Sequence, residues 1–261
     1  MAPARYTTNL SKAQGMLPET LELLELWEPG MSVGDLKARV RAAGALGKGT
    51  QVRVDDLVGR GFAPRFLYPP GPPARWLRQL LAGGIPRGVL RQLALIYTAR
   101  ANLILHDFVR EVFWLKCASH AGEVTGQDAR DFVEQAASRG AVAQRWSDGM
   151  VERVTRYLLG TLVDFDLLAG NRFGHRQIRP LFILPETVVF LAYELHFAGG
   201  DDTGVVRSPD WGLFGLPQAD VISALEKAAT HDHLFLQHSG AVLRIEWKHP
   251  TMEAMLDALA H

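Results

Sequence analysis

The sequence lacks the features that mark secreted and membrane-spanning proteins. Its 261 residues include one cysteine, Cys117, which cannot form an internal disulfide. The most apolar stretches, 93–105 and 181–193, each contain a charged residue, so neither supplies the roughly 18 uncharged residues of a membrane span. The first residues also lack the pattern of a signal peptide. We therefore expect a cytoplasmic protein with no membrane contact.

Catalytic and metal-binding motifs are missing as well. The segment 47–50 resembles the end of a phosphate-binding loop, but Gly49 stands where that motif needs serine or threonine. Three clustered histidines, His231, His233 and His238, lack the further ligand that a tetrahedral zinc site needs. The other candidates, Asp201, Asp202 and Cys117, lack a third hard ligand or an orienting base. We expect no enzymatic activity, cofactor or metal.

Net charge is also absent, because 28 basic residues balance 28 acidic ones. The balance is uneven along the chain. Residues 1–34 hold two basic and four acidic groups, and residues 181–261 hold four basic and eleven acidic groups, which leaves nine excess positive charges in 35–180. Such asymmetry is typical of a polyanion-binding face joined to a part with another role. An unevenly charged, solvated surface would give the same count.

Apolar residues recur at helical spacing over most of the chain, which predicts a mainly α fold, a helical bundle with helix-turn-helix or winged-helix-like modules. Strands are expected only as short hairpin wings near 172–184 and 234–248. Four segments follow: a helical, helix-turn-helix-like segment at 1–67, a proline spacer and central helical spine at 68–120, a basic winged-helix-like module at 121–185, and an acidic winged-helix-like module at 186–261.

Capping residues predict where several helices begin. Ser32, Thr50 and Ser147 each precede a helical pattern, and Thr125 with Asp128 has the spacing of a capping box. The apolar pattern from Arg87 to Cys117 predicts one long buried helix, and 178–184 is consistent with a strand.

Arginines are concentrated where a winged helix would meet DNA. Such a module presents its second helix to the major groove and neutralises phosphates from that helix and its wing. The predicted DNA-binding residues of the middle module are Arg145, Arg153, Arg156, Arg172, Arg176 and Arg179. A second basic group in the N-terminal segment consists of Lys48, Arg53 and Arg60. A winged helix used only for packing remains the alternative.

The C-terminal copy carries a different charge on its second helix. Its outward positions include Asp220 and Glu226, which would face phosphates unfavourably. Protein contact suits this module better than DNA.

The sequence contains five further motifs: Arg5-Tyr6-Thr7-Thr8, Glu22-Leu23-Leu24-Glu25-Leu26-Trp27, Leu46-Gly47-Lys48, Leu213-Phe214-Gly215-Leu216 and Val242-Leu243-Arg244-Ile245-Glu246-Trp247. These motifs resemble those of the BrxA family of bacterial BREX phage-defence systems. The resemblance implies a small, mostly helical, non-enzymatic component that binds double-stranded DNA and works beside other BREX subunits. The alternative is a protein–protein adaptor in the same defence complex, with its acidic C-terminal module as the binding surface.

Overall fold

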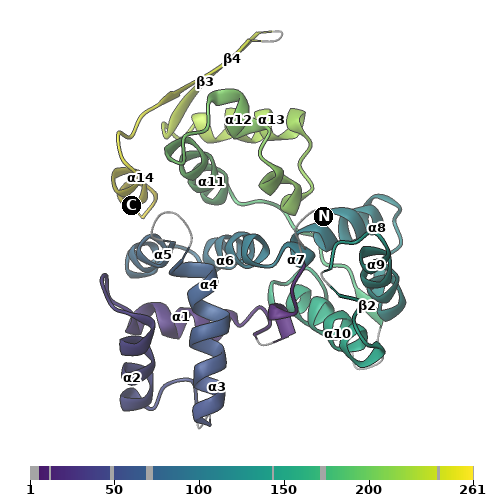
Figure 1. Ribbon diagram of the computed structural model, residues 1–261. Coiled ribbons are helices and arrows are strands. Elements are labelled where there is room, and N and C mark those ends of the chain that lie inside the picture. Colours follow the sequence, from purple (N-terminus) through teal and green to yellow (C-terminus); the bar gives the residue numbers. More distant parts are fainter. Residues whose placement is uncertain are drawn as a thin grey trace. The chain divides into compact units, whose positions relative to one another are not determined.

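A computed structural model describes residues 6–11, 13–47, 50–68, 73–142, 144–170, 175–239 and 242–260 (Figure 1). The chain divides into two compact units. Unit 1 comprises residues 1–75 and 94–181, and unit 2 comprises residues 76–93 and 182–261. Helices dominate both units, and the strands of the described residues form two small antiparallel pairs, so the predicted mainly α fold is confirmed.

Unit 1 begins with helices whose ends follow local capping chemistry. These are α1 (Leu17–Leu26), α2 (Val33–Ala43) and α3 (Gln51–Asp55). The Ser32 side chain accepts a hydrogen bond from the Asp35 amide, and the Asp35 carboxylate accepts one from the Ser32 backbone amide, which completes a capping box. The Thr50 side chain caps α3 with a single bond, which it accepts from the Arg53 amide. Both predicted helix starts are confirmed.

A widened helical turn continues α3. The π-helical segment η2 (Asp56–Phe62) leads without a break into α4 (Ala63–Phe66), where Pro64 stands in the first turn. Proline has no amide hydrogen and crowds the carbonyl four residues earlier, so an ordinary turn would be strained here. A Cβ on Gly61 would lie only 2.6 Å from the Ala13 Cβ. Glycine at this position therefore allows the segment around Ala13 to pass close to η2.

The predicted long helix from Arg87 to Cys117 is wrong in one respect, because it is interrupted. After α5 (Pro73–Ala82), the structure has α6 (Arg87–Ala101), α7 (Leu103–Phe108), a π-helical η3 (Val109–Phe113) and α8 (Trp114–Ala118). Asn102 leaves the helical region with φ −135° and ψ 82°. Its side-chain amide donates to the Thr98 carbonyl at 2.8 Å, which partly replaces the lost helical bonding.

The second half of unit 1 alternates short strands with two helices. Strand β1 (Glu123–Thr125) precedes α9 (Gly126–Ser138) and α10 (Asp148–Asp164), and β2 (His175–Gln177) returns antiparallel to β1. Residues 167–169 also run antiparallel to 177–179, through a Leu168–Ile178 bridge and a 2.8 Å bond from the Ala169 amide to the Gln177 carbonyl. Strand β2 lies within the wing expected near 172–184, but the strand expected at 178–184 is wrong, and the sequence missed β1.

An N-terminal segment ties these two halves of unit 1 together. We call residues 6–11 and 13–16 the N-terminal strap; it includes the short 3-10 helix η1 (Asn9–Ser11). Tyr6 bridges to Val142, and its hydroxyl donates to Asp107 Oδ2 at 2.7 Å. At its other end, the Gly15 amide donates to Asp164 Oδ2 at 2.9 Å. The strap therefore contacts both α10 and the helices before it.

Arg65 of α4 binds the strap through hydrogen bonds to its backbone. The side chain is only 2% exposed, and its guanidinium donates to the carbonyls of Ala13 and Gly15 at 2.5 and 3.4 Å. Burial lowers the pKa of Arg65 to about 10, partly offset by the negative charge of Asp164. The guanidinium therefore stays charged at neutral pH, and carbonyl oxygens satisfy two of its donors.

Unit 2 repeats the helix–helix–hairpin order. It contains α11 (Pro185–Phe197), α12 (Asp202–Val206), the 3-10 helix η4 (Pro209–Phe214), α13 (Gln218–Ala229), β3 (Leu234–Ser239), β4 (Val242–Trp247) and α14 (Met252–Leu259). Figure 1 shows the β3–β4 hairpin following α13 in this unit. The predicted hairpin at 234–248 is confirmed. Tyr193 anchors it to α11, because its hydroxyl donates to the His233 carbonyl and accepts from the Lys248 and His249 amides.

Candidate nucleic-acid interface

Helix α10 has one face in the core and one face open to solvent. Val151, Val154, Leu158 and Leu162 are buried at steps of three and four residues, as the sequence predicts. Arg153 and Arg156 lie on the exposed face, together with the acidic Asp148 and Glu152 near the helix start. Ser147 occupies the position before the helix, but its side chain makes no capping bond.

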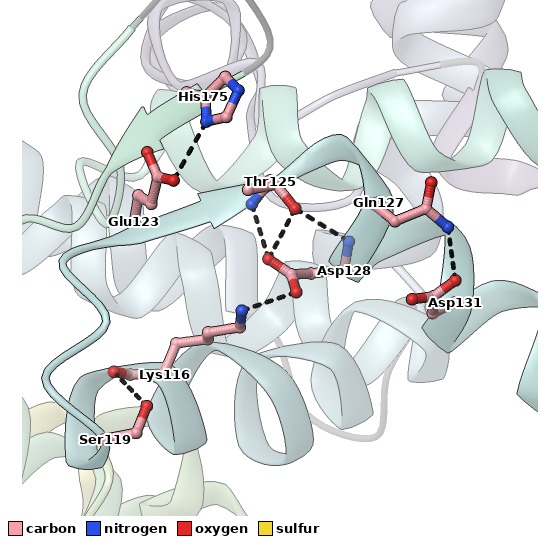
Figure 2. Close-up of polar contacts among 8 residues, drawn as sticks. All are labelled: Lys116, Ser119, Glu123, Thr125, Gln127, Asp128, Asp131 and His175. Atoms are coloured by element: carbon pink, nitrogen blue, oxygen red, sulfur yellow. Dashed lines mark hydrogen bonds and ion pairs between the residues drawn. The ribbon is translucent and has the colours of Figure 1, made fainter.

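Helix α9 supports α10 and begins at a network of polar contacts (Figure 2). Thr125 and Asp128 form the predicted capping box, which is confirmed. Lys116 of α8 pairs with Asp128 at 2.7 Å, so this carboxylate joins α8 to the end of β1 and the start of α9. Figure 2 also shows His175 of β2 reaching Glu123 of β1. Burial opposes ionisation of Asp128, but its bonds from Lys116 and Thr125 outweigh burial and lower its pKa.

Replacing Asp128 with alanine is expected to lower the free energy of unfolding by about 1–2 kcal/mol, because one change removes a helix cap and an ion pair. Denaturant unfolding at pH 7 measures this loss. Asp131→Ala is the matched control, since Asp131 is exposed on the same helix and accepts from Gln127 alone among the described residues. Equal losses from both variants would contradict the role given to the network.

The pH dependence of the Asp128 contribution follows from the lowered pKa. Its stabilising effect is present above the unfolded-state pKa near 3.8 and is lost as pH falls through the lower folded-state pKa. The stability difference between wild type and Asp128→Ala should therefore shrink below about pH 4.

Three of the predicted DNA-binding residues are exposed and form no ion pair within the described part of the chain. They are Arg145, in the approach to α10, and Arg153 and Arg156 on the helix. The Arg156 guanidinium carbon lies 5.7 Å from the centroid of the Tyr157 ring, a cation–π contact that uses no hydrogen-bond donor. These three arginines can therefore contact an anion without first breaking a salt bridge.

The predicted residues of the wing are placed differently. Arg179 is exposed and pairs with Asp166. Arg176 stands opposite Val124, which is fully buried, and the Arg176 side chain is half-buried with its Nε enclosed. Arg172 lies outside the described residues.

The N-terminal basic group is balanced by neighbouring carboxylates. Arg60 pairs with Asp56 at 3.1 Å, and Arg53 lies 3.7 Å from Glu19. Lys37 and Arg41 share Asp55 at 3.1 and 3.0 Å, and Arg39 pairs with Glu28 at 2.8 Å. Lys48 lies outside the described residues. The sequence missed these pairings because most join residues of different helices, and no spacing rule reveals them.

The corresponding helix of unit 2 presents acidic groups instead. On α13, the exposed positions include Asp220, Ser223, Glu226 and Lys227, while Val221, Leu225 and Ala228 are buried. The two units thus share an order of elements but differ in the charge of the exposed helix.

Metal binding and membrane insertion each require a recognisable local feature. Within the described ranges, no group of three or more histidine, cysteine, aspartate or glutamate side chains could hold a metal ion. Across the same residues, no helix combines the length and the apolar character that a bilayer crossing requires.

The geometry defines a class of protein by its architecture: mainly helical, with two units that each lead a pair of helices into a short hairpin, one of them with arginines on its exposed helix. Residues 4–194 match the BrxA family, and the chain belongs to that family. It is therefore a component of a BREX phage-defence system. The match includes the three N-terminal motifs named above and ends before the two C-terminal ones.

A solved structure supports the fold alone. It is the crystal structure of an uncharacterized protein from Magnetospirillum magneticum, which is 16% identical in sequence with a TM-score of 0.60. The similarity covers 78% of this chain and 98% of that one. No curated protein matches the sequence.

Proposed function

We propose that the protein is a non-enzymatic, double-stranded DNA-binding component of its BREX system. In this proposal β1, α9, α10 and the antiparallel segments 167–169 and 177–179 act as a winged helix, with α10 as the recognition helix. The order of strand, two helices and returning hairpin supports this role. The observation that carries it is the set Arg145, Arg153 and Arg156, which is exposed and free of ion pairs with described residues.

Charge favours the middle module over the N-terminal segment as the DNA-binding surface. An arginine that already pairs with a carboxylate must give up that contact to bind phosphate, so Arg53 and Arg60 contribute less net attraction. Arg179 of the wing is similarly engaged by Asp166, so it plays a secondary role.

The second candidate function is a protein–protein adaptor, and α13 favours it for unit 2. An exposed helix with Asp220 and Glu226 repels phosphates but complements a basic protein surface. In a protein that combines both roles, unit 1 binds DNA and unit 2 contacts another defence subunit.

Salt titration tests the DNA-binding proposal. If three arginines neutralise three phosphates, the logarithm of the affinity should fall with the logarithm of salt concentration with a slope of about −2.7, or roughly 40-fold between 50 and 200 mM salt. Fluorescence anisotropy with a labelled duplex measures this slope, and single-stranded DNA and RNA serve as comparisons. An affinity that does not change with salt, or no measurable duplex binding at 50 mM, would leave the adaptor as the better proposal.

A further inference from the structure

Unit 1 contains a pocket that the DNA-binding proposal does not use. It has a volume of about 410 Å³, which is within the usual range for small-molecule sites. The strap and the start of α1 form one side, α3 and η2 a second, and α10 a third. The residues that matter for its chemistry are Gln14, Glu19, Arg53, Leu57, Tyr157 and Asp164.

The charged groups that line the pocket sum to −1, and the buried guanidinium of Arg65, which is outside the lining, also acts on Asp164. Glu19 and Asp164 supply two carboxylates, and Arg53 supplies one positive charge. Arg53 is only loosely engaged, since its guanidinium lies 3.7 Å from the Glu19 carboxylate and more than half of its side chain is exposed. Burial raises the pKa of Asp164, the Gly15 and Met16 amides lower it in part, the charge of Glu19 raises it, and the charge of Arg65 lowers it, with a net rise. A further cation in the pocket would stabilise both carboxylates.

The remaining walls suit the carbon chain of a ligand. Leu57 and Met16 are buried apolar side chains, and Tyr157 adds an aromatic ring and a hydroxyl. The Gln14 amide adds a hydrogen-bond donor and acceptor. An aromatic wall, an apolar wall and two carboxylates are the groups that enclose organic ammonium and guanidinium ions.

We propose that this pocket binds a small organic cation with amine or guanidine groups at the ends of a short carbon chain. Glu19 accepts one cationic group at the α1 side, Asp164 faces a second from α10, and Tyr157 with Leu57 covers the chain between them. Free diamines and the side chains of basic proteins share this chemistry.

Occupation of the pocket would also change Arg53, a consequence that rests on the proposed DNA binding. A cation on Glu19 replaces Arg53 as the partner of that carboxylate. The guanidinium is then released toward solvent, where it adds one phosphate contact. By linkage, DNA and the cation would each strengthen binding of the other.

Calorimetry on the full chain without DNA tests the site itself. Three probes share a four-carbon chain: putrescine carries two amines, 1,4-butanediol two hydroxyls, and succinate two carboxylates. We expect saturable binding of putrescine and at least tenfold weaker binding of the diol and of succinate. Agmatine should bind as well, and a lysine-rich peptide that competes with putrescine would identify a protein side chain as the source of the cation.

Glu19→Gln keeps the size of the side chain and removes the charge, and it should weaken putrescine binding by about tenfold or more. Glu25→Gln is the matched control, because Glu25 is exposed on the same helix and does not line the pocket; its affinity should equal wild type. Equal binding of putrescine and butanediol, preference for succinate, or equal losses in both variants would overturn the site.

A duplex-binding titration with and without putrescine, at constant ionic strength, then tests the coupling. At a concentration that just fills the wild-type pocket, putrescine should raise duplex affinity more for wild type than for Glu19→Gln, whose pocket binds it about tenfold or more weakly. An identical effect on both proteins would show that putrescine acts on the DNA and would overturn the coupling. The calorimetric test uses no DNA, so its result does not depend on the duplex titration. A failure of the DNA-binding proposal can therefore be distinguished from a failure of the pocket to bind a cation.

Discussion

Reversing two charges on α10, Arg153→Glu with Arg156→Glu, should weaken duplex binding by about 100-fold at low salt and reduce the salt slope by about 2. Both side chains are exposed, so neither change touches Val151, Val154 or Leu158 in the core. The fold should therefore remain, as circular dichroism and thermal unfolding can check. Fluorescence anisotropy at several salt concentrations measures the affinity and the slope together.

The matched control reverses Arg244 and Lys248 in unit 2, which changes the net charge by the same amount. Arg244 is exposed on β4, and Lys248 lies 3.8 Å from Asp232 in a region rich in carboxylates. We expect a much smaller loss of DNA affinity and, instead, a weaker association with a protein partner. Equal losses from both pairs would contradict a site on α10. No loss from either would move the site to the segment around Lys48, Arg53 and Arg60.

Arg65→Met should lower the free energy of unfolding by about 3–4 kcal/mol, the largest effect on stability that we expect from one substitution. Methionine fills most of the volume, but it leaves the carbonyls of Ala13 and Gly15 without their buried donor. It also removes a positive charge that stabilises the half-buried Asp164. Guanidinium denaturation at pH 7 measures the change.

Arg60→Met provides the comparison for Arg65, because Arg60 is exposed and pairs with Asp56 within the same helical run. An exposed ion pair of this kind contributes less than about 1 kcal/mol. A loss below 1 kcal/mol from Arg65→Met would show that water satisfies the strap carbonyls once the guanidinium is gone.

The sequence predicted the start of a helix correctly where a single capping side chain determines it. Ser32, Thr50 and the Thr125–Asp128 pair each satisfy amides within three residues, so their effect is visible without the rest of the chain. The break at Asn102 was not predictable in this way. Its neighbours are as apolar as those of an uninterrupted helix, and the deviation depends on tertiary packing.

The candidate site was predictable only in part, for a similar reason. Helical spacing predicted that Arg153 and Arg156 lie on the exposed face of α10, and the structure confirms this position. Whether an arginine is engaged by a carboxylate depends on residues far along the chain, as with Arg53 and Glu19. The cation pocket was invisible for the same reason, since its walls come from the strap, α1, α3, η2 and α10.

The strap also imposes an order on folding during synthesis. Tyr6 and Gly15 find their partners 101 and 149 residues later, at Asp107 and Asp164. At about 5–20 residues per second, a ribosome needs roughly 7–30 s to bring Asp164 out after Gly15. During this time α1–α4 can form their own caps, but Arg65 and the apolar Leu10 and Met16 lack the surroundings that bury them. The nascent chain therefore passes through a stage in which the strap waits for Asp107 and Asp164 before it becomes protected from chaperones and proteases.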